Sequence, residues 1–94
     1  MIDYSVLNEV GDERFRQDEK WGVQNHIQIA WLAILAEEFG EAAKEVNELH
    51  FRPGTETHHS TAVYEAQKAR LREELIQVAA VAVAMIESLD RTGR

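Results

Sequence analysis

The apolar run 75–86 limits the possible folds more than any other part of this sequence. Its only polar residue is Gln77. A helix that is apolar on all sides is buried on all sides. The surrounding pattern predicts one helix over about 60–89, which at 1.5 Å per residue is ~45 Å long. Two further helices of the same short chain cannot enclose it, so the sequence predicts a homo-oligomer, a dimer at least, in which chains share this helix.

The rest of the chain is also predicted to be helical. Proline occurs once and glycine five times among 94 residues, and both residues have low helix propensity. Two more helices are expected over about 3–20 and 27–50, with breaks at Trp21-Gly22 and around Pro53-Gly54. We therefore expect an all-α fold, a long-helix bundle in a single domain spanning 1–94 and completed by homo-oligomerisation.

Composition excludes several classes of protein. The net charge is −7 and cysteine is absent, so there is no basic surplus for binding nucleic acid and no thiolate metal site. The first residues lack the basic start and apolar run of a signal peptide. The longest apolar run is shorter than the ~18 residues that a membrane span needs. We expect a soluble, cytoplasmic protein with no nucleic-acid partner and no membrane contact.

Three glutamates gather within about one turn of the predicted second helix. Glu38 and Glu41 are three residues apart, and Glu37 and Glu41 are four apart, so their carboxylates share one side of the helix. Like charges at this spacing repel each other. A bound cation would relieve the repulsion, and oxygen ligands favour Mg²⁺, with Mn²⁺ as a possible substitute. The alternative is a solvated acidic face without a ligand.

The helical wheel places this cluster at the border of the core. At ~100° per residue one apolar stripe is predicted to face the interior, and Trp31 and Glu38 fall on its edge, with Glu41 just beyond. Six residues make up the stripe: Leu32, Leu35, Phe39, Ala42, Val46 and Leu49.

A second polar pair lies where the apolar run begins. Glu74 and Gln77 repeat the three-residue spacing of Glu38 and Glu41. A buried amide without a partner costs about 1–3 kcal/mol, so Gln77 needs one. It could fix register across an oligomer seam, or it could join Glu38, Glu41 and Glu74 in a shell of oxygen ligands for Mg²⁺.

These two motifs together resemble a known family. Glu37-Glu38-x-x-Glu41 followed by Glu74-x-x-Gln77 is similar to the EExxE…ExxD signature of MazG-like all-α nucleoside triphosphate pyrophosphatases. The segments 13–22 and 35–45 also resemble small members of that family. The sequence departs from the pattern at Gln77, where an aspartate is usual. Glutamine supplies a neutral oxygen, so it could ligate directly, act through water or orient Glu74.

The resemblance implies an activity and roles for the acidic residues. Family members hydrolyse a nucleoside triphosphate, often a deoxynucleotide, between the α- and β-phosphates. The catalytic residues would be Glu37, Glu38 and Glu41, with Glu37 polarising the attacking water or binding a second metal. The Mg²⁺ ligands would be Glu38, Glu41, Glu74 and Gln77. Small relatives often pair dimers into tetramers, and we expect the same here.

Substrate-binding candidates surround the end of the first predicted helix. Trp21 could stack on the nucleobase, or it could merely close that helix against the second one. Arg16, Gln17, Lys20 and Asn25 are the nearby candidates for phosphate or base-edge contacts. Trp31 is expected in the core or as lining at the pocket edge. Lys44, one turn beyond Glu41, could reach a phosphate, or it could pair with Glu41 or be solvated. Two alternatives stay open: a phosphoribosyl-ATP pyrophosphohydrolase type of enzyme, and a non-catalytic helical adaptor that presents an acidic face.

Overall fold

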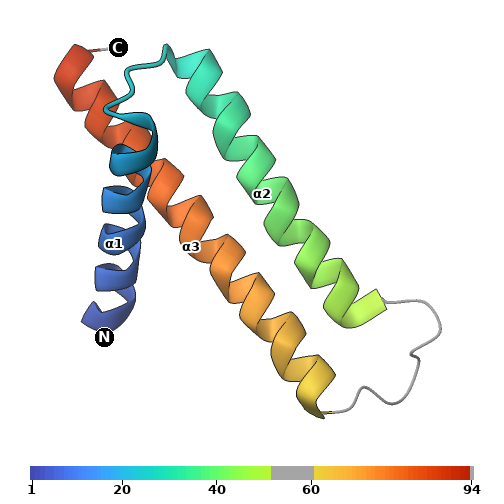
Figure 1. Cartoon of the computed structure of the whole chain (residues 1–94). Helices are drawn as coiled ribbons and strands as arrows, with labels where there is room; N and C mark the ends of the chain where they lie inside the picture. Colours follow the sequence, from blue (N-terminus) through green and yellow to red (C-terminus); the bar gives the residue numbers. More distant parts are fainter. Residues whose placement is uncertain (52–60, 94) are drawn as a thin grey trace.

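The computed structural model describes residues 1–51 and 61–93, which form three α-helices and no strand. The helices are α1 (Tyr4–Trp21), α2 (Gln28–Phe51) and α3 (Thr61–Thr92), drawn in Figure 1. The all-α prediction is therefore confirmed, and each helix begins one residue after its expected start. The predicted break at Pro53-Gly54 lies outside the described residues.

Local sequence explains both ends of α1. The Oδ1 atom of Asp3 accepts a hydrogen bond from the Ser5 N–H at 2.9 Å and so satisfies a free donor of the first turn. Gly22 ends the helix with a φ of 73°, a conformation that glycine adopts without steric cost. Its N–H donates to the Asp18 carbonyl at 2.8 Å. The predicted end at Trp21-Gly22 is therefore confirmed.

The long helix α3 is the centre of the arrangement. Both α1 and α2 pack against it, whereas α1 and α2 do not pack against each other within the described part of the chain. Figure 1 shows α2 and α3 as a long antiparallel pair, with α1 beside the C-terminal half of α3. The molecule is elongated, with extents of 51 × 28 × 28 Å. Residues far apart in the sequence therefore meet where α1 and α2 pack against α3.

The apolar core is small and sits between α2 and α3. Trp31 packs with Val81 and Ala84, and Ile34, Leu35 and Met85 lie at the edge of this cluster. The predicted interior stripe of α2 was only partly right. Ala42 and Leu49 are buried, but Leu32 is 59% and Phe39 66% exposed. The face toward α3 instead includes Trp31 and the half-buried Glu38, about 100° around the helix from Phe39.

One chain does not enclose α3. Its buried side carries Ala80, Val81 and Ala84, whereas Leu75 and Ile86 are 52% and 57% exposed. These two residues belong to the run that the sequence predicts to be buried on all sides. Within 1–51 and 61–93, no helix is both long and apolar enough to cross a membrane.

Candidate functional site

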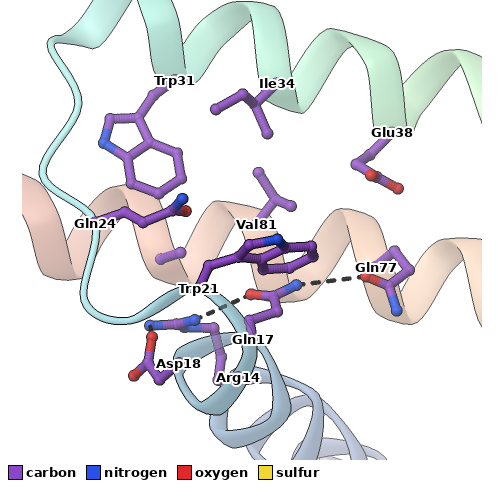
Figure 2. Close-up of a pocket in the computed structure, with 11 residues that line it drawn as sticks. Arg14, Gln17, Asp18, Trp21, Gln24, Trp31, Ile34, Glu38, Gln77 and Val81 are labelled. Carbon is purple, nitrogen blue, oxygen red and sulfur yellow. Dashed lines mark hydrogen bonds and ion pairs between the residues drawn. The ribbon is translucent and has the colours of Figure 1, made fainter.

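A pocket of about 220 Å³ opens where α1 meets the α2–α3 pair (Figure 2). Two indole rings, several amides and two carboxylates form its wall, so it combines flat apolar surfaces with hydrogen-bonding groups. The lining residues are Arg14, Gln17, Asp18 and Trp21 of α1, Gln24 of the linker, Trp31, Ile34 and Glu38 of α2, and Gln77, Val81 and Ala84 of α3.

The α1 side of this pocket follows from helical spacing. Arg14, Gln17 and Trp21 stand at positions i, i+3 and i+7, which share one face of a helix. Gln17 is buried, whereas Trp21 is 53% exposed. An aromatic ring that is half open to solvent and borders a pocket is suited to stacking on a flat ligand.

Arg14 joins α1 to α3 and orients a pocket amide. Its Nε donates to Glu87 of α3 at 2.8 Å, and its Nη1 donates to the Oε1 of Gln17 at 3.0 Å. Its Nη2 lies 3.1 Å from Asp18. The Arg14 side chain is only 12% exposed. Because the Gln17 oxygen is occupied by Arg14, the Gln17 Nε2 group faces away as a donor.

That donor points to the one polar residue of the apolar run. Gln17 Nε2 donates to Gln77 Oε1 at 3.4 Å, as the dashed line in Figure 2 marks. Gln77 also hydrogen-bonds the carboxylate of Glu13. The pKa of Glu13 is lowered, first by its hydrogen bonds from Arg16 and also by the one from Gln77. Gln77 therefore has partners on α1, and its role toward a metal stays a prediction.

Glu38 and Glu74 bring negative charge together from two helices. Partial burial raises the pKa of Glu38, and the charges of Glu74, Glu37 and Glu41 raise it further. Burial likewise raises the pKa of Glu74, and the nearby charges of Glu41 and Glu45 add to the effect. The charge of Glu74 thus acts on Glu38, and the charge of Glu41 acts on both half-buried carboxylates.

The carboxylates fit a hard cation in chemistry but are not gathered around one point. In the described part of the chain, no three acidic or histidine side chains lie close enough together to hold a metal ion. Glu37 and Glu41 are exposed, and Glu38 and Glu74 are half-buried.

A second, wider hollow of about 520 Å³ adjoins the pocket at Gln77, which lines both. It carries charges of both signs. Arg16 pairs with Glu13 at its rim, and Arg72 of α3 pairs with Glu9 of α1. The remaining lining residues are Asp12, Glu73, Glu74 and Ile76. A surface with arginines beside carboxylates can contact both a polyphosphate and its cation.

Several predicted site residues lie away from both hollows. Lys20 is exposed, and its ammonium group stands 4.7 Å from the centre of the Trp21 ring. Asn25 accepts a hydrogen bond from Arg91 at 2.9 Å and so holds the linker to α3. Glu37 and Lys44 are exposed on α2, and neither belongs to the lining of the two hollows. Their proposed roles stay predictions.

Sequence reasoning missed four polar residues around the pocket: Arg14, Asp18, Gln24 and Glu87. A signal was available for two of them, because Arg14 and Asp18 fall on the same face of the first helix as Gln17 and Trp21. The predicted substrate-binding residues Arg16 and Lys20 lie on the neighbouring face of the same helix. Glu87 is 73 positions from Arg14, and no local pattern indicates that pairing.

Comparison of the chain with known protein families, with curated proteins and with solved structures found no match. The pyrophosphatase resemblance therefore depends on the acidic and tryptophan-containing motifs of the sequence itself.

Proposed function

We propose that this protein is a cytoplasmic, Mg²⁺-dependent nucleoside triphosphate pyrophosphohydrolase. It would cleave a nucleoside or deoxynucleoside triphosphate between the α- and β-phosphates and release the monophosphate and pyrophosphate. The observation that supports this most is a junction of two environments: an aromatic, amide-lined pocket adjoins mutually repelling carboxylates from two helices.

The pocket suits a nucleobase. Trp21 and Trp31 provide flat apolar surfaces, and the Gln17 amide offers hydrogen-bond donors held in place by Arg14. Base-binding sites commonly combine stacking surfaces with a few fixed polar groups. In this proposal the base occupies the pocket, and the triphosphate extends past Gln77 toward the acidic side.

The acidic side suits a polyphosphate accompanied by a divalent ion. Glu38, Glu41 and Glu74 would hold Mg²⁺, which neutralises phosphate charge and makes bound water more acidic. The raised pKa values of Glu38 and Glu74 are compatible with this assignment, because they reflect partial burial first and, after it, neighbouring negative charge that a cation would offset. Glu37 is the proposed base that takes a proton from the attacking water, and Arg16 is close enough to the second hollow to contact phosphate.

A pyrophosphate-release screen over standard and modified NTPs and dNTPs with Mg²⁺ tests the activity. We expect pyrophosphate and a nucleoside monophosphate as products, with no orthophosphate. Glu38→Gln and Glu41→Gln should abolish turnover while the helical content is unchanged, whereas Glu19→Gln, an exposed change on α1, should leave turnover intact. Unchanged turnover in both cluster variants would remove the proposed site.

The same screen distinguishes the alternatives. Release of pyrophosphate from phosphoribosyl-ATP alone would identify the related enzyme type. If no nucleotide is hydrolysed and Mg²⁺ does not change thermal stability, the non-catalytic adaptor becomes the better explanation of the acidic cluster.

A further inference from the structure

The linker between α1 and α2 supplies one side chain of the pocket, that of Gln24. Residues 22–27 lie between the two helices, and in Figure 2 the half-buried Gln24 extends from this linker on the side of Trp31. Glu38 lines the same pocket seven residues further along α2, which is about 10.5 Å along a helix. Gln24 therefore belongs to the aromatic part of the pocket, away from the acidic side.

The last turn of α3 holds this linker in place. Nε and Nη2 of Arg91 donate to the Asn25 Oδ1 atom at 3.1 and 2.9 Å. Nη2 of Arg91 also donates to the main-chain oxygen of Gln24 at 3.1 Å. Arg91 and Asn25 do not line the pocket themselves. The arginine thus fixes the backbone of Gln24 and leaves its side chain unused.

Three side-chain amides line the pocket, and they differ in their hydrogen bonding. Gln17 accepts a hydrogen bond from Arg14 and donates one to Gln77. Gln77 in turn bonds Glu13. The carboxamide of Gln24, by contrast, has no hydrogen-bond partner within 1–51 and 61–93. An amide that has no partner in the protein can give both its donor and its acceptor to a ligand.

We propose that Gln24 recognises the hydrogen-bonding edge of the base and that Arg91 positions it for this contact. The inference rests on the proposed function in one respect, because that function places a base in this pocket. A carboxamide presents a donor and an acceptor side by side. Guanine presents a carbonyl oxygen beside its N1–H, and thymine presents a carbonyl oxygen beside its N3–H. The Gln24 amide can therefore form one donated and one accepted hydrogen bond with either base.

A carboxylate at this position would distinguish the same two bases. It can only accept hydrogen bonds. Guanine offers it two adjacent donors, N1–H and the 2-amino group. Thymine offers one donor between two carbonyl oxygens, so one carboxylate oxygen would face another oxygen. Replacing the amide by a carboxylate should therefore move the preference of the pocket from thymine toward guanine.

The test is the ratio of two dissociation constants for Gln24→Glu. Titration calorimetry measures the Kd of the α,β-imido analogues of dGTP and dTTP with Mg²⁺, because these analogues cannot be cleaved between the α- and β-phosphates. The ratio of the thymine Kd to the guanine Kd should rise about 10-fold relative to the parent. Repulsion between the new charge and the phosphates acts on both analogues and cancels in the ratio. Gln28→Glu is the matched control, because it adds the same charge at an exposed position outside the pocket.

The role of Arg91 is tested through its effect on that ratio. In an Arg91→Ala background, Gln24→Glu should change the ratio much less, because the linker no longer holds position 24 against the base. Arg70→Ala is the control, since Arg70 is another half-exposed arginine of α3 and pairs with Glu45. If Arg91 were needed for stability alone, Gln24→Glu would change the ratio equally in both backgrounds.

Two results would overturn the recognition by Gln24: a ratio that Gln24→Glu leaves unchanged, and an equal change in Gln28→Glu. Circular dichroism checks that the variants fold. Gln24→Met, which keeps the length but removes both polar atoms, should weaken the binding of both analogues, and unchanged affinities there would also overturn the proposal. If the parent binds neither analogue, the proposal fails together with the nucleotide site.

These outcomes separate the inference from the proposed function. Pyrophosphate release from dGTP and dTTP with an unmoved ratio would keep the enzyme and remove Gln24 as the residue that recognises the base. A ratio that moves as expected, without pyrophosphate release from any nucleotide, would keep the recognition by Gln24 and remove the catalysis.

Discussion

Gln17 of α1 donates a hydrogen bond to Gln77 of α3 at 3.4 Å, across a separation of 60 residues. The glutamine that stands where the resembled signature has an aspartate is thus tied to the neighbouring helix. A neutral amide at this point can accept from Gln17 and donate to Glu13 at once, which a carboxylate cannot do. The glutamine that departs from the family pattern therefore has a physical reason to be present in this chain.

The first prediction follows from that relationship. Gln77→Asp should raise the affinity for Mg²⁺, because it adds a carboxylate beside Glu74 and Glu38. The same change should lower the melting temperature in EDTA, because the new charge repels Glu13 and Glu38 without a cation. Titration calorimetry and thermal unfolding measure the two effects. Asn47→Asp adds the same charge at an exposed position of α2 and should change neither quantity; equal effects of both variants would contradict the prediction.

The second prediction concerns the pH dependence of stability. The pKa of Glu38 is raised above its ordinary value of 4.5 by burial and by neighbouring carboxylates. The folded protein therefore binds a proton at Glu38 more readily than the unfolded chain does, and its stability falls as pH rises through the folded pKa. In EDTA at neutral pH, Glu38→Gln should raise the melting temperature by a few degrees, since about 1 kcal/mol corresponds to roughly 4–8 °C for a domain of this size.

The advantage of Glu38→Gln should shrink as the pH falls through the folded pKa of Glu38 toward 4.5, and it should be lost below 4.5, where the carboxyl is protonated in both the folded and the unfolded state. Thermal unfolding across this pH range measures it. At neutral pH, saturating Mg²⁺ should make the parent protein more thermally stable than Glu38→Gln, because the variant lacks a metal ligand. A Glu38→Gln protein that is less stable than the parent in EDTA at neutral pH would count against crowded charge at this site.

The third prediction concerns Arg14, which holds α1 to α3 and orients Gln17. Arg14→Met keeps most of the side-chain length but removes every donor. It should lower the free energy of unfolding by about 1–3 kcal/mol, because Glu87 and the buried Gln17 lose a partner. If the pocket binds substrate, KM should rise more than kcat falls, since Arg14 positions a binding group and does not join the reaction.

Chemical denaturation and steady-state kinetics measure these changes. Arg16→Met is the matched control for stability, because Arg16 is 56% exposed and bonds within its own helix. In a double-mutant cycle, Arg14→Met and Glu87→Gln should be non-additive. Additive losses would show that the Arg14–Glu87 pair contributes nothing of its own.

The fourth prediction assigns Trp21 to ligand stacking. Trp21→Ala should raise the Kd of the nucleotide roughly 5- to 150-fold, because stacking of one base on an aromatic ring contributes about 1–3 kcal/mol. Trp21→Phe should keep most of the affinity. The helix should remain folded in both variants, since Trp21 is 53% exposed. Fluorescence of the remaining tryptophan, Trp31, reports binding in the variants. Phe51→Ala, which removes another exposed ring, should leave the affinity unchanged, and an equal loss there would argue against stacking.

Local sequence was sufficient to predict the three helices. Helix propensity and the glycine at position 22 act within a few residues of the chain, and the observed starts of the helices differ from the expected ones by one residue. The expected end of the third helix at Leu89 was three residues too early, because α3 continues to Thr92. The acidic residues Glu38 and Glu74 were also identified from spacing, because side chains three apart share a helix face wherever the helix packs.

Only the tertiary structure decided how the helices are rotated against each other. Periodicity fixes the relative positions of Leu35, Glu38 and Phe39 on one helix, but both faces of α2 carry enough apolar residues to be buried, so the wheel alone could not choose between them. The packing of Trp31 against Val81 and Ala84 selects the face. It thereby turns Glu38 inward and leaves Phe39 exposed.

The hydrogen-bond partners of Gln77 and Arg14 could not be predicted from the sequence for the same reason. Each bonds a residue at least 60 positions away, and such pairs depend on helix rotation and crossing, which are properties of the packed chain. The sequence by itself determined which segments are helical and which residue types each face offers, because those are local properties. Which faces meet was decided by tertiary packing, since only close contact between side chains of different helices can distinguish one apolar face from another.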